Sequence, residues 1–228
     1  MEENIAVLMA DLTGYTALTE THGAASAADL IDRYVEIVED CLIGDSKLQE
    51  RIGDEVMILS SSADFLISTA ALIIKRTLKE ENFLQVHGGL HYGRVLKRNN
   101  SYFGSAINLT ARIASKASPG TFWSSKEFIN SLTDKSLFKF QSKGQHRFKN
   151  INEEKEIVEL VDKHSNSFFI DPVCKMLILN KSIAKQHSEK QELFFCSQAC
   201  LDIFKNRHGV YSSELTTSIL KGSHLNIN

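Results

Sequence analysis

The sequence predicts an α+β fold, and three observations support this prediction. Short apolar runs with the length of β-strands recur through most of the chain. Between them, two longer stretches place apolar residues at helical spacing, with charged residues on the opposite side. One pair of strand-like runs is separated only by Gly53 and Asp54, a two-residue turn that is typical of a β-hairpin.

The expected elements follow this pattern along the chain. They are, in order, a buried strand at 5–10, a helix at 24–42, the hairpin around Gly53-Asp54, a helix at 63–79, a strand at 86–96, a helix from near Ser105 to before Pro119-Gly120, and short strands around one helix at 121–161. Helices that alternate with strands, including a hairpin, indicate an α/β sandwich of the ferredoxin-like type.

The composition excludes several classes of protein. The chain has 228 residues, of which 43% are hydrophobic and 24% charged, and its net charge is −2, as in an ordinary soluble globular protein. This balance predicts no general attraction to nucleic acid or to an anionic membrane. No apolar run approaches the roughly 20 residues that span a bilayer. The N-terminus MEENIAV lacks the basic start of a signal peptide, so we expect a cytoplasmic location.

The chain is expected to contain two folded parts. A polar stretch, DKHSNS, follows the last predicted strand, and a compact cysteine-containing unit follows that stretch. The expected boundaries are a main domain over 1–162, a linker over 163–168, a small unit over 169–211 and a flexible polar tail over 212–228.

Two aspartates mark the first candidate site. Asp11 follows the apolar strand, just before a turn at Gly14, and Asp54 lies at the tip of the hairpin. If the two strands are neighbours, both carboxylates reach one point, where they can hold divalent ions for phosphoryl chemistry. Each residue also has a structural interpretation, Asp11 as a helix cap and Asp54 as a turn residue.

Asn108 and Arg112 form a second candidate set. They are four residues apart in a predicted helix and share one face, while Leu109 and Ile113 point toward the other side. Arginine offers a fixed fork of donors for phosphate oxygens, and asparagine can orient a sugar oxygen. A solvated helix face is the alternative interpretation.

Four separated segments together resemble the class III adenylyl and guanylyl cyclase catalytic domain: ADLTGYT, ERIGDEVMI, HGGLHYGRV and FGSAINLTARIASKASPG. The resemblance covers about residues 5–161. It implies that the ribose 3′-hydroxyl of a nucleoside triphosphate attacks the α-phosphorus and that pyrophosphate leaves. It also implies two Mg²⁺ or Mn²⁺ ions per active site, held by Asp11 and Asp54. Asn108 and Arg112 would come from the other subunit of a homodimer, orienting the ribose and stabilising the transition state.

The same resemblance implies which groups contact the phosphates. Lys149 matches a phosphate-contacting lysine of the family. The backbone N–H groups that would hold the phosphates belong to Leu12, Thr13, Gly14, Tyr15 and Thr16.

Glu50 and Ser101 occupy the two positions that select the base in this family. Adenylyl cyclases typically carry Lys and Asp there, and guanylyl cyclases Glu and Cys, so this pair departs from both. An ionised Glu50 only accepts hydrogen bonds, which suits the N1–H and N2–H₂ donors of guanine and not the N1 acceptor of adenine. Ser101 can donate to guanine O6 or accept from adenine N6–H₂. We therefore expect GTP to be favoured over ATP, with a pyrimidine nucleotide left open; the alternative for Glu50 is a solvent-facing strand residue.

Cys174, Cys196 and Cys200 form a third candidate site. Cys196 and Cys200 are four residues apart at a predicted helix start, so both sulfurs can bind one ion, with Cys174 reaching it from a turn fixed by Pro172. Three sulfurs suit Zn²⁺, iron or Cu(I) and leave a tetrahedral site one ligand short, which His187, water or a partner could supply. The alternative is three buried, small apolar residues.

The segment at about 169–211 resembles the YHS domain, a small metal-binding module, through DPVCKM and FFCSQACLDIF. Lys175 stands where that domain has glycine, which predicts an altered turn. The resemblance implies a role in metal-linked sensing or folding.

The sequence as a whole predicts a homodimeric nucleotide cyclase whose C-terminal metal-binding unit biases the dimer. Neither a nucleic acid nor a membrane is expected as a partner. The alternatives are a catalytically inactive, cyclase-like scaffold and a protein whose main role is metal sensing. Retention of the aspartates and of the Asn/Arg set favours the enzyme.

Overall fold

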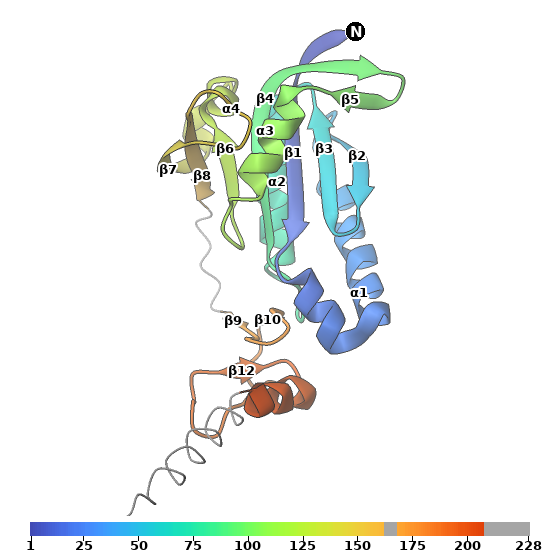
Figure 1. Cartoon of the computed structure of the whole chain (residues 1–228), viewed down its shortest axis with the longest axis vertical. Helices are drawn as coiled ribbons and strands as arrows, with labels where there is room; N and C mark the ends of the chain where they lie inside the picture. The colour runs from blue at the N-terminus through green and yellow to red at the C-terminus, as the bar shows by residue number, and fades with distance from the viewer. Residues whose placement is uncertain (162–167, 208–228) are drawn as a thin grey trace, which may run out of the picture.

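The computed structural model describes residues 1–161 and 168–207, which form a layered α+β domain and a small C-terminal unit (Figure 1). The expected linker at 163–168, apart from Phe168, and the expected tail at 212–228 lie outside the described residues. None of the helices within the described ranges is long and apolar enough to cross a bilayer. The predicted α+β fold is confirmed.

An eight-stranded sheet forms the middle layer, in the order β2-β3-β1-β4-β6-β8-β7, with β5 paired to β4. Only β4 and β6 pair in parallel; the other pairs are antiparallel. The strands are β1 (Glu2–Leu12), β2 (Lys47–Ile52), β3 (Glu55–Ser60), β4 (Val86–Arg98), β5 (Ser101–Phe103), β6 (Phe122–Ser125), β7 (Lys139–His146) and β8 (Lys155–Val161).

Helices cover both faces of the sheet, because the side chains of β1 alternate between two apolar clusters. Ala6, Leu8 and Ala10 lie in the large core shared with α1 and α2. Val7 and Met9 pack against residues of α3. This helix lies on the opposite face of the sheet from α2 (Figure 1). The helices are α1 (Tyr15–Asp40), α2 (Ala63–Thr77), α3 (Ser105–Ala114), α4 (Lys126–Asn130) and the short 3₁₀ turn η1 (Lys135–Leu137).

The first helix begins nine residues before the predicted start and bends at Gly23, where φ is 84° and ψ is 168°. A residue with a side chain rarely adopts this conformation, so glycine permits the bend. The sequence before Gly23 has no clear apolar periodicity, which is why the pattern predicted only the later part. The bend separates a short first segment, residues 15–22, from the long part that packs on the sheet.

The small unit consists of two short hairpins and a helix. Strands β9 (Phe169–Ile170) and β10 (Leu177–Ile178) form one hairpin, and β11 (Lys185–Gln186) and β12 (Phe194–Phe195) form the other. The helix begins after Ser197. In the turn before β10, Lys175 has a φ of 68°, so a lysine adopts the left-handed conformation that glycine favours.

Backbone hydrogen bonds join the small unit to the main domain. The Leu177 N–H donates to the carbonyl oxygen of Phe83 at 2.6 Å, and the Asn82 N–H donates to that of Leu177 at 3.1 Å. The Leu177 side chain is fully buried in the main core. Figure 1 shows the small unit, in orange and red, beside the first turns of α1.

Candidate active site and candidate metal centre

The end of β1 and the β2–β3 turn bring Asp11 and Asp54 together. Strands β1 and β3 are antiparallel neighbours, and Ala10 pairs with Val56, so the strand end meets the turn. The two carboxyl groups share a hydrogen bond. Burial raises the pKa of Asp11, and burial together with the hydrogen bond and charge of Asp11 raises the pKa of Asp54 to about 6. Two carboxyl groups this close do not both ionise easily, so the pair keeps a proton to higher pH than isolated carboxyl groups do.

The surroundings of this acid pair, Asp11 and Asp54, add negative charge. The charge of Glu55 raises the pKa of Asp11, although burial is the larger cause of that shift. The hydroxyl of Tyr34 is buried, and within the described residues it has no hydrogen-bond partner. Burial and the charges of these three acids hold the pKa of Tyr34 well above its usual value. Clustered carboxylates beside an unpartnered hydroxyl suit a hard cation that accepts oxygen ligands, so the residues present fit Mg²⁺ or Mn²⁺.

The loop after β1 uses some of its N–H groups internally. The Leu12 N–H donates to Asp11 Oδ1 at 2.9 Å, and the Thr13 N–H donates to the carbonyl oxygen of Gln85 at 2.8 Å. Gly14, with a φ of 91°, begins α1, which has no side-chain cap there. Of the N–H groups expected to contact phosphate, those of residues 12 and 13 are thus already used. The N–H groups of residues 14–16 stay as candidates, at an uncapped helix start that suits an anion.

The side chains of Asn108 and Arg112 are exposed on the outer face of α3. On the inner face of the helix, Leu109 and Ile113 are buried in an apolar cluster. The acid pair instead lies at the end of β1 and in the β2–β3 turn. Among the described residues, no hydrogen bond or ion pair joins Asn108 or Arg112 to the acid pair of the same chain.

The two positions expected to select the base lie on segments that are joined to each other. Glu50 is exposed on β2, next to a bulge, and Ser101 is exposed at the start of β5. The side-chain amide of Gln49, which precedes Glu50, donates to the carbonyl oxygen of Asn100, which precedes Ser101, at 2.7 Å. Lys149 is exposed in the turn after β7.

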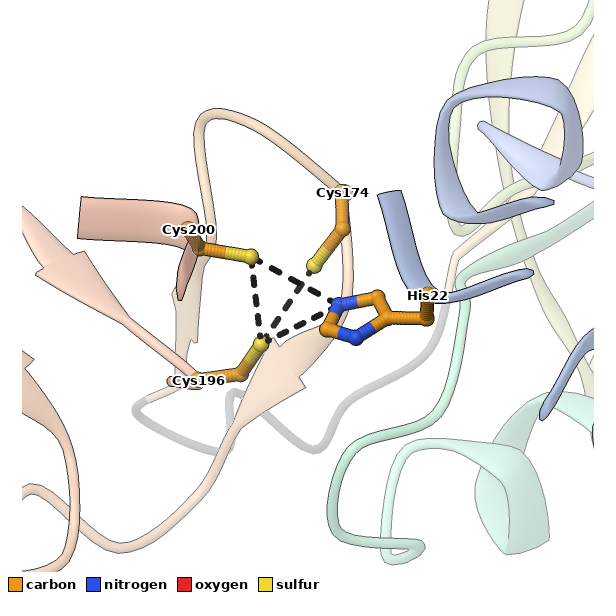
Figure 2. Close-up of side chains that lie close together, drawn as sticks. All are labelled: His22, Cys174, Cys196 and Cys200. Carbon is orange, nitrogen blue, oxygen red and sulfur yellow. Dashed lines mark hydrogen bonds between the residues drawn. The ribbon is translucent and has the colours of Figure 1, made fainter. Parts of the chain in front are cut away.

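Four side chains from distant parts of the sequence form a second cluster (Figure 2). The three predicted cysteines, Cys174, Cys196 and Cys200, gather around the ring of His22, and all four ligand atoms lie within 4.8 Å of one another. The cluster does not include His187, whose Nδ1 accepts hydrogen bonds from the N–H groups of residues 189 and 190. The structure thus supplies the missing fourth ligand from α1.

The protein orders this thiol cluster with a buried carboxylate. Asp171 is fully buried, and its two oxygens accept hydrogen bonds from the N–H groups of Cys174 and Cys196 at 3.3 and 2.8 Å. The hydroxyl of Ser197 accepts a hydrogen bond from the Cys200 N–H at 3.2 Å. A hydrogen bond with Cys174 lowers the pKa of Cys196 to about 7, and burial raises the pKa of Cys200 to about 12. One sulfur of the cluster is therefore close to ionising at neutral pH.

Sequence reasoning missed three residues of these sites. His22 gave no signal except that the cysteines were one ligand short. Tyr34 lies within the expected helix at 24–42, where nothing in the pattern marks its hydroxyl as part of a site. His87 lies in the expected strand at 86–96, and no motif marks it as a site residue; its Nδ1 lies 3.0 Å from Thr13 Oγ1, and its charge lowers the pKa of Asp54.

The fold and the acid pair define a nucleotide cyclase catalytic domain, and comparison with known proteins agrees. A model of the adenylate and guanylate cyclase catalytic domain matches residues 1–164, so the chain belongs to this family. Members of the family bind nucleoside triphosphates and act as dimers.

Individual relatives cover the same region. An uncharacterized protein of Mycobacterium tuberculosis is 36% identical over 126 residues, or 55% of this chain and 33% of that protein. The adenylate cyclase of Glutamicibacter nicotianae is 31% identical over 134 residues, or 58% of this chain and 33% of that enzyme. The chain thus matches about a third of the length of these curated relatives. The crystal structure of the adenylyl cyclase CyaB from P. aeruginosa has a TM-score of 0.61 at 18% identity and covers 72% of this chain and 97% of that chain, which shows a common fold.

Proposed function

We propose that this protein converts a nucleoside triphosphate, GTP in preference to ATP, to its 3′,5′-cyclic nucleotide and pyrophosphate at the interface of a homodimer. The observation that supports this most strongly is the acid pair, in which Asp11 and Asp54 are held together with raised pKa values beside the uncapped start of α1. Such an arrangement is costly for the protein alone and is relieved by a divalent cation with a triphosphate.

The reaction forms a bond between the ribose 3′ oxygen and the α-phosphorus and breaks the bond from that phosphorus to the bridging oxygen of pyrophosphate. The 3′-hydroxyl proton passes to solvent. Asp11 and Asp54 would hold two Mg²⁺ or Mn²⁺ ions, which supply neutralisation of phosphate charge and a lowered pKa for the hydroxyl.

The other groups of this chain position the substrate. The N–H groups of residues 14–16 bind phosphate oxygens at the start of α1. Asn108 orients the ribose, and the guanidinium of Arg112 stabilises charge that develops on the phosphate oxygens in the transition state. Arg112 is therefore expected to affect turnover more than substrate binding.

Two chains are needed for this chemistry. Asn108 and Arg112 are exposed on the outer face of α3, and no hydrogen bond or ion pair among the described residues joins them to the acid pair of their own chain. A symmetric dimer would place the Asn/Arg set of each chain against the acid pair of the other and form two equal sites.

The base preference rests on Glu50, an exposed carboxylate beside the Gln49–Asn100 hydrogen bond. It complements the donors of guanine and would face the N1 acceptor of adenine without a donor. ATP is the competing substrate, since several relatives are named adenylate cyclases.

A complementation experiment tests the proposal. The purified chain is incubated with Mn²⁺ and each of the four nucleoside triphosphates, and cyclic products are detected by mass spectrometry. Asp54→Ala and Arg112→Ala are each expected to be inactive alone. When the two variants are mixed, the heterodimer contains one intact site, so about a quarter of wild-type activity should return. No product from any nucleotide would favour the inactive scaffold, and failure of the mixture to recover would contradict the shared site.

A further inference from the structure

The geometry of the thiol cluster defines a metal site that joins the two units of the chain. Cys196 Sγ lies 3.5 Å from Cys174 Sγ, 3.6 Å from Cys200 Sγ and 3.6 Å from His22 Nε2, and Cys200 Sγ lies 3.5 Å from that nitrogen. Ligands about 2.3 Å from a tetrahedral ion are separated by about 3.8 Å, so these spacings need little adjustment. We propose that His22, Cys174, Cys196 and Cys200 bind one Zn²⁺ ion, which clamps the C-terminal unit to the first segment of α1.

The ligand set indicates the class of metal. Three sulfurs and one imidazole form a soft, four-coordinate set that suits Zn²⁺, and with all four positions filled by protein there is no open position for a reacting water. On binding, the three thiols lose their protons to solvent, and the site with its ion has a net charge of −1. The inference is thus of a closed site that holds structure in place, separate from the oxygen ligands of the acid pair.

Asp171 supports this assignment as a positioning residue. Its buried carboxylate binds the backbone of both cysteine segments, 174 and 196, at once. The segments that hold these sulfurs are therefore ordered by the fold before an ion arrives. His22 is the last residue before the bend at Gly23, so its ring is carried by the short first segment of α1.

The first segment of α1, which carries His22, begins at the candidate phosphate loop. This segment connects the proposed zinc site to the candidate active site. Lys175, next to Cys174, lies directly against Gly14, since a Cβ on that glycine would be 2.6 Å from the Lys175 side chain. The loop at 81–85 connects the two units as well. Glu81 accepts the N–H of Leu179, and the carbonyl of Gln85 accepts the N–H of Thr13.

Zinc occupancy is therefore expected to set the position of residues 13–22 and with it the affinity for the triphosphate. This coupling rests on the proposed function, whereas the zinc site itself does not.

Zinc binding is measured first, on the full chain, by competition with a chromophoric chelator and by Co²⁺ substitution. One equivalent should bind, and Co²⁺ should give the thiolate charge-transfer and visible bands of a tetrahedral site. His22→Ala should lower the zinc affinity about 10- to 100-fold. The matched control is His187→Ala, which removes an imidazole from the C-terminal unit that carries the three cysteines and should change the affinity less than about twofold. Equal affinity for His22→Ala and wild type, or no bound ion in the wild type, would overturn the site.

The coupling is measured second. Removal of zinc from the wild type should raise the KM for the triphosphate at least about threefold and increase amide hydrogen exchange in residues 13–22. His22→Ala should show neither response to zinc. If zinc binds through His22 but neither exchange nor KM changes, the clamp does not reach the loop and the coupling is wrong. If exchange changes in a chain that forms no cyclic product, the proposed enzyme fails while the clamp stands.

Discussion

The acid pair and the thiol cluster lie at the two ends of one short segment, residues 11–22, yet they solve the problem of ion binding in opposite ways. The acid pair offers two carboxyl groups held close together, and burial with the hydrogen bond and charge of Asp11 raises the pKa of Asp54 to about 6. The thiol cluster offers four ligand atoms at nearly tetrahedral spacing, with Asp171 ordering the backbone beneath them.

This difference indicates a division of roles. A site with two protein ligands must be completed by oxygens from elsewhere, which suits an ion that arrives with a triphosphate and leaves with pyrophosphate. A site with four protein ligands needs nothing from solvent and suits an ion that stays. Strain at the acid pair and order at the thiol cluster are thus expected features of a transient and a resident ion.

Removing one carboxylate of the acid pair should have the largest effect. Asp54→Asn removes one of the two ion ligands, so cyclic-nucleotide formation is expected to fall at least about 1,000-fold. Its stability should not fall, because a repulsion in the folded state is also removed. Rate measurements with Mn²⁺ and chemical denaturation check both parts. The control is Asp29→Asn, an exposed acid on α1, which should leave both quantities unchanged. An active Asp54→Asn protein would contradict the two-carboxylate site.

Removing the central sulfur of the thiol cluster should come next. The Cys196 sulfur contacts the other three ligand atoms, so Cys196→Ser is expected to lower zinc affinity about 100-fold or more. Chelator competition measures this directly. Cys41→Ala removes a buried thiol outside the cluster and should bind zinc like the wild type. If Cys196→Ser binds zinc with wild-type affinity, the thiol cluster is not the zinc site.

A pH experiment distinguishes how a histidine on the neighbouring strand β4 affects stability from how the acid pair affects it. His91 on β4 is buried, with its Nδ1 2.7 Å from Ser125 Oγ, and burial lowers its pKa to about 4 against the opposing charge of Glu127; the nearby Lys155 lowers it further. At His91, the folded state therefore binds fewer protons than the unfolded state between pH 6.5 and 4. The stability that the neutral His91 contributes is present above pH 6.5. It is lost as the pH falls, by at most roughly 3 kcal/mol.

The variant His91→Gln isolates this contribution, because the raised pKa of Asp54 has the opposite sign and is present in both proteins. Urea unfolding of metal-free protein at pH 7.5 and pH 5 should show a larger loss for the wild type than for His91→Gln. Equal losses would mean that His91 is protonated without cost in the folded state.

The sequence predicted the acid pair because its geometry follows from local rules. An apolar run ending in Asp11 and a two-residue turn containing Asp54 place both residues once the strands pair. The fourth ligand of the thiol cluster could not be predicted in this way. His22 is more than 150 positions away from the cysteines, and its placement depends on docking between two units that no local pattern records. The positions of Asn108 and Arg112 relative to the acid pair of a second chain stay a prediction for a similar reason, since they depend on contacts between chains. The likeness of the small unit to a YHS domain also stays a prediction.

The smallest effect should come from the bend at Gly23, directly after His22. Gly23 has φ 84° and ψ 168°, and a Cβ added there would meet no atom within 4 Å, so Gly23→Ala changes backbone preference alone. The expected cost is about 1–2 kcal/mol of stability. Because the bend directs the segment that ends in His22, the same change should weaken zinc binding a few-fold.

Gly144→Ala is the matched control for this bend. Gly144 lies in the β7 bulge, has a φ of 82° and likewise has no atom within 4 Å of an added Cβ. It should lose similar stability, measured by chemical denaturation, while keeping wild-type zinc affinity. If both variants weaken zinc binding equally, the loss reflects general stability and the bend has no special role. If only Gly23→Ala does so, the bend is what aims the imidazole of α1 at the sulfurs, and the transient and resident ions are connected through the backbone of one segment.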